Sequence, residues 1–386
     1  MIAYNKIWLN NLFVQEEAGI ACDENCITKE ELDNINARHP AGFYTSNFFI
    51  RIGLFILTKI IMTFSLGLIA LISLDAIEKT AGGLTIFFAL LSFGALEYFI
   101  HEKKHFRSGV DDALLWGGAI ALFCGACIPN NFDATGLCIL AFFITAICTV
   151  RYADRLMAAV CFISFLGIVF FICSKAGSFA KAILPFVIMA ISLTTYLIVK
   201  KINKREVFSV YAGCTLIIEI ISLLILYTAG NYLIVRELSN TMFDLKLQPT
   251  QSLPFGFLFW IFTIIIPLIY LFLGIRKKDT VLLRVGLLLI AAIVFTVRYY
   301  YSIMAPEILM TISGTAMIII AWALTRYLSV PKYGFTEQEL STRHVLDKMN
   351  IESLVIAQTF SQQTQQTGET KFGGGSFGGG GASGDF

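Results

Sequence analysis

Long apolar runs alternate with short polar stretches along most of the chain. Ten runs are apolar enough to be interpreted as membrane-crossing helices, and the stretches between them are rich in charged and turn-forming residues. The predicted spans are residues 50–74, 82–100, 113–128, 136–150, 156–173, 182–199, 207–229, 253–275, 281–303 and 306–328. The pattern therefore predicts an all-α, polytopic integral membrane protein with about ten transmembrane helices.

Two of the predicted spans, 113–128 and 136–150, are short for their role. A helix needs about 20 residues to cross a hydrocarbon core of about 30 Å. We expect each of the two to borrow flanking residues such as Asn130 and Asn131. A re-entrant hairpin that merges both runs is the alternative.

Polar sequence flanks the apolar block on both sides. Residues 1–47 predict a cytoplasmic helical segment, in which Thr28 and Glu31 form a capping box. The ten-helix domain is expected over residues 48–328. Residues 329–357 predict a cytoplasmic amphipathic helix, and residues 358–386, rich in Gln, Thr and Gly, predict a disordered tail.

The composition supports a membrane protein. The 386 residues are 56% hydrophobic and 15% charged, whereas about a quarter of a soluble domain is charged. The net charge of +2 indicates no nucleic-acid surface. The expected partners are therefore the lipid bilayer and a small solute or ion, with a cytosolic protein partner possible through the tail.

The distribution of Lys and Arg predicts the orientation. Basic residues gather in alternate loops, at residues 101–112, 151–155, 200–206 and 276–280. Loops of this kind stay on the cytoplasmic side, so we expect a multi-pass protein with both termini in the cytoplasm. The first 25 residues contain no cleavable signal peptide, which makes the first span an uncleaved signal-anchor.

Residues 97–105, EYFIHEKKH, contain the His-Glu-x-x-His pattern of zinc proteases. On one continuous helix, Glu97, His101 and His105 would share a face. Two lysines stand beside the supposed ion, however, and no pattern for a third ligand follows. The sequence therefore predicts a basic helix end that binds no metal, and no cofactor is expected elsewhere.

Ionisable residues inside the spans carry the strongest functional signal, because a charge in hydrocarbon is costly and usually marks a pathway or a pair. Lys59 lies ~14 Å above residue 50, and Glu219 lies ~18 Å above residue 207, at about 1.5 Å per residue. We expect these two to pair or to line one cavity. In the alternative, Lys59 reaches toward Glu97 and leaves Glu219 protonated. The intramembrane candidates are Lys59, Glu97, Glu219, Arg284, Arg298 and Glu307.

The overall plan resembles a family of bacterial polytopic membrane proteins of unknown function. The resemblance rests on the helical start (NKIWLNNLFVQEEAGI, TKEELDNI), the passage RSGVDDALLWGGAI with acids at a helix start, and the Gly-rich tail KFGGGSFGGGGASGDF. It implies a location in the inner (plasma) membrane of a bacterium. It implies no catalytic activity.

Three functions remain open from the sequence. A transporter or permease-like protein, not an enzyme, is the first, and a deep polar cavity around Glu219 would favour it. A membrane assembly or sensory scaffold that binds a cytosolic partner is the second, and a solid helical block would favour that. A membrane metalloenzyme that uses His101 and His105 is the third, and a bound metal would favour it.

Overall fold

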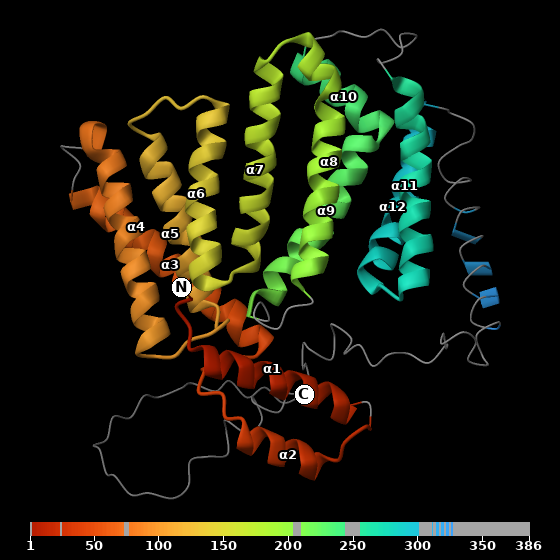
Figure 1. The fold of residues 1–386 in the computed structure, drawn as a ribbon. Helices are drawn as coiled ribbons and strands as arrows, with labels where there is room; N and C mark the ends of the chain where they lie inside the picture. Colours follow the sequence, from red (N-terminus) through yellow and green to blue (C-terminus); the bar gives the residue numbers. More distant parts are fainter. Residues whose placement is uncertain are drawn as a thin grey trace, which may run out of the picture.

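The computed structural model describes residues 2–23, 25–72, 77–203, 210–243 and 255–300, together with eight separate residues between 311 and 326. The described residues form twelve helices (Figure 1). The helices are α1 (Lys6–Asp23), α2 (Lys29–Arg38), α3 (Phe48–Ile72), α4 (Ile77–His101), α5 (Val110–Cys127), α6 (Ala134–Tyr152), α7 (Arg155–Lys175), α8 (Ser178–Ile202), α9 (Ala212–Gly230), α10 (Tyr232–Phe243), α11 (Gly256–Lys277) and α12 (Thr280–Tyr300).

Nine helices of the described part are long and apolar enough to cross a membrane, namely α3 to α9, α11 and α12. The predicted all-α polytopic fold is thereby confirmed. Each of the first nine predicted spans matches one of these helices, because the length of an apolar run fixes the helix that forms from it. The tenth predicted span, 306–328, falls outside the described residues apart from the eight separate ones.

The two short spans are separate helices. α5 has 18 residues and α6 has 19. At about 1.5 Å per residue they reach ~27 Å and ~29 Å, close to the thickness of the hydrocarbon core. Asp133 caps the start of α6 by accepting the N–H of Gly136 at 2.9 Å. Each helix is thus long enough to cross the hydrocarbon core by itself, and the two do not merge into a re-entrant hairpin.

Helix α10 is an addition to the predicted elements, because the hydrophobic pattern leaves residues 230–252 as the connection between two predicted spans. It contains 12 residues, too few to cross a membrane. Asn231 starts it, accepting the N–H groups of Leu233 at 3.0 Å and Ile234 at 3.2 Å. A short helix of mixed polarity needs such a cap and tertiary packing in order to form.

The N-terminal helices lie across one end of the membrane block (Figure 1). The capping box of α2 is confirmed, with Thr28 N–H bound to Glu31 at 2.8 Å and Glu31 N–H bound to the Thr28 hydroxyl at 3.2 Å. The residues before α1 contact the membrane block, because the N–H of Ala3 donates to the carbonyl of Arg151 at 2.8 Å. The segment therefore shares the core of the block.

Neighbouring helices pack in pairs, α4 with α5, α6 with α7, α8 with α9, and α11 with α12. One buried apolar cluster joins the N-terminal segment with α3 to α7, and a second joins α8, α9, α11 and α12. α7 contacts both α8 and α9. The outer surface exposes large apolar side chains such as Phe64 (76%) and Phe257 (76%), as expected of a surface in contact with lipid.

The basic ends of α4, α6, α8 and α11 lie at the end of the block where α1 and α2 lie (Figure 1). The positive-inside rule predicts that this end is cytoplasmic. A topology reporter fused after Thr135 should therefore report the non-cytoplasmic side, and one fused after Asn203 the cytoplasmic side. A fusion after Asp154 is the matched control and should agree with Asn203. Agreement between the Thr135 and Asn203 fusions would show that the number of crossings between them is wrong.

Candidate functional site

Three partners hold Glu97 at the end of α4. One carboxylate oxygen accepts hydrogen bonds from Arg151 Nε at 2.6 Å and from the Tyr152 hydroxyl at 2.7 Å. The other oxygen lies 3.1 Å from Nε2 of His101, one turn further along α4. The predicted proximity of Glu97 and His101 is confirmed. The expected alternative partner of Glu97, Lys59, is wrong, because Arg151 of α6 takes that place.

The His-Glu-x-x-His segment does not stay on one helix. α4 ends at His101, and Lys104 adopts a left-handed backbone with φ 56°. His105 then forms an isolated parallel bridge with Tyr44. His101 and His105 therefore do not share a helical face, as the zinc-protease arrangement would require, because the helix stops before the second histidine.

His105 instead holds a loop together. Its Nδ1 lies 2.7 Å from the hydroxyl of Ser108, and its ring packs 5.3 Å from the ring of Phe99, between centroids. Burial lowers the pKa of His105 from its ordinary value. Within the described part of the chain, no group of three or more His, Cys, Asp and Glu side chains could hold a metal ion. The expectation that the segment binds no metal stays a prediction.

A buried charge cluster surrounds Glu219. Lys200 Nζ lies 2.8 Å from a carboxylate oxygen of Glu219 and 2.6 Å from one of Asp279. The side chains of Glu219 and Asp279 are 2% and 9% exposed, and that of Lys200 is 37% exposed. Two carboxylates share one ammonium group, so the cluster has a formal charge of −1.

Three helices bring this cluster together. Lys200 stands in the last turn of α8, Glu219 in the middle of α9, and Asp279 caps α12 by accepting the N–H of Val281 at 3.1 Å. Tyr196, one turn before Lys200, is also buried. The predicted pair of Lys59 with Glu219 is wrong, because α8 supplies the lysine.

The sequence pattern places Lys200 in the basic loop 200–206, and nothing in it singles out Asp279. A lysine at a helix end looks like an orientation signal. The packing of α8 on α9 brings the Lys200 side chain to Glu219.

The other predicted candidates lie apart. Lys59 rests 5.8 Å from the centroid of the Phe55 ring and reaches α5 beside Gly117. Arg284 is exposed on α12, and Arg298 is partly buried on the same helix. Among the described residues, none of these three cations forms an ion pair. Glu307 lies outside the described residues.

A second polar network lies at the opposite end of the same helices. The amide of Asn231 donates to the Tyr227 hydroxyl at 2.8 Å and to the Thr296 hydroxyl at 3.0 Å. Thr263 accepts the N–H of Tyr232 at 3.0 Å. All these groups are buried. Buried polar side chains thus occupy both ends of the part of the block formed by α8 to α12, which is called the α8–α12 half below.

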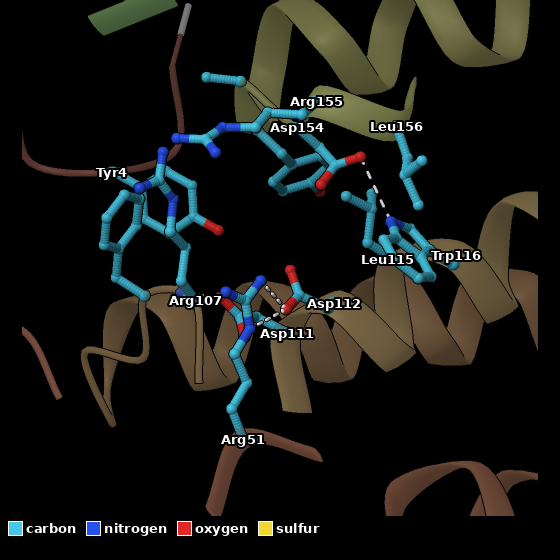
Figure 2. Close-up of a pocket in the computed structure, with 13 residues that line it drawn as sticks. Tyr4, Arg51, Arg107, Asp111, Asp112, Leu115, Trp116, Asp154, Arg155 and Leu156 are labelled. Atoms are coloured by element: carbon cyan, nitrogen blue, oxygen red, sulfur yellow. Dashed lines mark hydrogen bonds and ion pairs between the residues drawn. The ribbon is translucent and has the colours of Figure 1, made fainter. Parts of the chain in front are cut away.

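A polar pocket opens at the end of the block that faces α1. Its cavity of about 250 Å³ lies between the N-terminal segment, the start of α3, the loop before α5, and the starts of α5 and α7 (Figure 2). Its charged lining residues are Arg51, Arg107, Asp111, Asp112, Asp154 and Arg155. Two further cavities are apolar lateral grooves, one between α5, α6 and α7 and one between α7, α8, α9 and α10. None of these three cavities is lined by Glu219.

Comparison with protein-family models, with curated proteins and with solved structures gives no match for this chain.

Proposed function

We propose that the chain is a permease-like solute transporter of a bacterial inner membrane, in which Glu219 with Lys200 and Asp279 takes up and releases a proton during transport. The observation that supports this proposal is the unbalanced buried cluster. Two carboxylates with little exposure share one ammonium group. A formal charge of −1 that is buried at one end of the membrane block attracts one further cation.

The energetics favour a functional cluster over a structural one. Replacing a buried ion pair by packed apolar residues is often neutral or stabilises a protein by about 1–4 kcal/mol. Surrounding apolar helices offer many such packing solutions, yet α8 and α9 each contribute a charged side chain, and a third charge caps the start of α12. Ionisable groups that remain in such a place usually mark an ion or proton pathway.

The shape of the α8–α12 half fits this role. Pro185 lies inside the continuous helix α8, and Pro267 lies inside the continuous helix α11. Proline removes a backbone N–H and frees the carbonyl one turn earlier, and free backbone carbonyls are among the groups that coordinate ions in carriers. The network around Asn231 supplies polar groups ~18 Å from Glu219 along α9, at about 1.5 Å per residue.

The second candidate function is a membrane assembly or sensory scaffold. The observation that favours it is the N-terminal helical pair, where α2 buries no residue and α1 exposes Ile7 (69%) and Phe13 (50%). Apolar side chains left uncovered outside the membrane block are typical of a surface that binds a partner.

Proteoliposomes with a trapped pH indicator separate the two candidates. A panel of amino acids, carboxylates, sugars and organic cations is added under an imposed membrane potential. We expect at least one solute to change the internal pH, the Glu219→Gln protein to lose this signal, and the Glu237→Gln protein to keep it. Glu237 is an exposed carboxylate on α10, which makes it the matched control.

Two results would contradict the transport proposal. The first is a solute-driven pH change that Glu219→Gln retains, which would place the coupling elsewhere. The second is the absence of any signal together with a more stable Glu219→Gln protein. That combination would show that the cluster lowers the stability of the protein without contributing to transport, and it would favour the scaffold function.

A further inference from the structure

We infer that the pocket between α3, α5 and α7 is a binding site for a phosphate group, held by Arg107 and Arg155 with the hydroxyl of Tyr4. The site is separate from the Glu219 cluster and does not depend on the transport proposal. The inference starts from the charged groups that line the cavity (Figure 2).

The three carboxylates of the pocket already have partners. Asp112 accepts two hydrogen bonds from the guanidinium of Arg51, at 2.9 Å and 2.6 Å. Asp111 accepts the backbone N–H groups of residues 107, 108 and 109, at 2.6 Å, 2.9 Å and 3.1 Å. Asp154 caps α7 and accepts the indole N–H of Trp116 at 3.2 Å.

The two remaining arginines have no such partner. Among the described residues, neither Arg107 nor Arg155 forms an ion pair. The Arg107 guanidinium rests over the ring of Phe106, 5.0 Å from its centroid. Burial and, next, the charge of Arg155 lower the pKa of Arg107, while the carboxylates of Glu16 and Asp112 counteract this in part. Two guanidinium groups that repel each other across a cavity are stabilised by an anion between them.

The pocket is neutral in formal charge, but its charges are separated in space. Figure 2 shows the Arg155 side chain running toward Arg107 and Tyr4, while the carboxylate of Asp154 turns the other way, toward Trp116. Burial and the nearby aspartates raise the pKa of Tyr4 well above its ordinary value, so its hydroxyl stays protonated. The side of the cavity next to Tyr4 therefore presents two guanidinium groups, which only donate hydrogen bonds, and a hydroxyl that can donate one.

The backbone is shaped to place both guanidinium groups. Arg107 has a left-handed backbone with φ 51°, a conformation that costs a non-glycine residue energy and is common at functional sites. Arg155 lies against Gly213 of α9, where a Cβ atom would stand 2.5 Å from Arg155 Nε. A larger residue at position 213 would push the guanidinium away.

The size and place of the cavity define the ligand class. A volume of about 250 Å³ is smaller than the pockets that enclose drug-sized ligands, so a phosphate group fits better than a whole nucleotide. Two arginine forks match the tetrahedral oxygens of phosphate. The pocket opens at the end of the membrane block, where the phosphate could belong to a lipid headgroup or to a free phosphate ion.

The test uses the full-length protein purified in a neutral detergent. Inorganic phosphate is titrated by calorimetry, and in parallel the protein is placed in nanodiscs of phosphatidylcholine with or without phosphatidylglycerol, from which retained lipid is counted by native mass spectrometry. Phosphate binding identifies the free ion, and retention of either phospholipid identifies the headgroup, because phosphatidylcholine and phosphatidylglycerol both carry a phosphate. Either result supports the site. Failure of both would overturn it.

Variants locate the binding in the pocket. Arg107→Gln and Arg155→Gln should each weaken binding about tenfold or more, because each removes charge-assisted hydrogen bonds. Lys103→Gln removes an exposed cation from the same loop and should leave binding unchanged. Gly213→Ala keeps every charge and should weaken binding by displacing Arg155, which tests the site even if an arginine variant folds poorly. Unchanged binding in Gly213→Ala and in both arginine variants would refute the proposed location.

Discussion

A methyl group added at Gly109 should prevent the start of α5 from packing on α3. Gly109 has φ 95°, and a Cβ atom there would stand 2.1 Å from the carbonyl oxygen of Arg51. That oxygen belongs to the backbone of α3, so it cannot move aside as a flexible side chain would. We expect Gly109→Ala to lower the free energy of unfolding by about 2–5 kcal/mol, from the left-handed backbone and the overlap together.

The measurement is the thermal midpoint of the purified protein, followed by tryptophan fluorescence. Gly53→Ala on α3 is the matched control, because nothing lies within 4 Å of its Cβ position. Alanine favours a helix over glycine by about 1 kcal/mol, so this variant should be neutral or slightly stabilised. A Gly109→Ala protein as stable as Gly53→Ala would show that α3 and α5 do not approach this closely.

Replacing Lys200 with methionine should destabilise the protein by about 3 kcal/mol, the lower end of the range for a broken buried ion pair. The variant leaves the carboxylates of Glu219 and Asp279 facing each other without a counter-charge. The lower end applies because the lysine side chain is 37% exposed and water screens part of its charge. Thermal midpoints in detergent measure the effect.

The control is Lys201→Met, which removes an exposed cation from the neighbouring position. It should change the midpoint little. The double variant Lys200→Met, Glu219→Gln removes one of the two stranded charges and should be more stable than Lys200→Met alone. If the double variant is as unstable as the sum of the two single variants, Lys200 and Glu219 do not interact.

The membrane fold could be predicted from the sequence because an apolar run of sufficient length specifies its own helix. The first nine spans needed only local information, and even the capping box of Thr28 and Glu31 is local. α10 could not be predicted in the same way. Its 12 residues depend on Asn231, which also binds Thr296 of α12.

The sites were predicted only where both partners lie on one helix, as with Glu97 and His101. Arg151 and Lys200 escaped prediction because each stands at a helix end, where basic residues serve as orientation signals. Their acidic partners lie on other segments: Glu97 of α4 for Arg151, and Glu219 of the next helix together with the distant Asp279 for Lys200. The phosphate pocket was missed for a related reason, since its residues come from the N-terminal segment, a loop and the starts of three helices.

The ion pair between Glu97 and Arg151 has a consequence for the order of events during synthesis. Arg151 follows Glu97 by 54 residues, and ribosomes add about 5–20 residues per second, so Glu97 waits roughly 3–11 seconds for its partner. His101 is made only four residues after Glu97 and lies 3.1 Å from it on the same helix. The first histidine of the zinc-like pattern thus gives the carboxylate an early partner, which shields Glu97 while α5 and α6 are still being inserted.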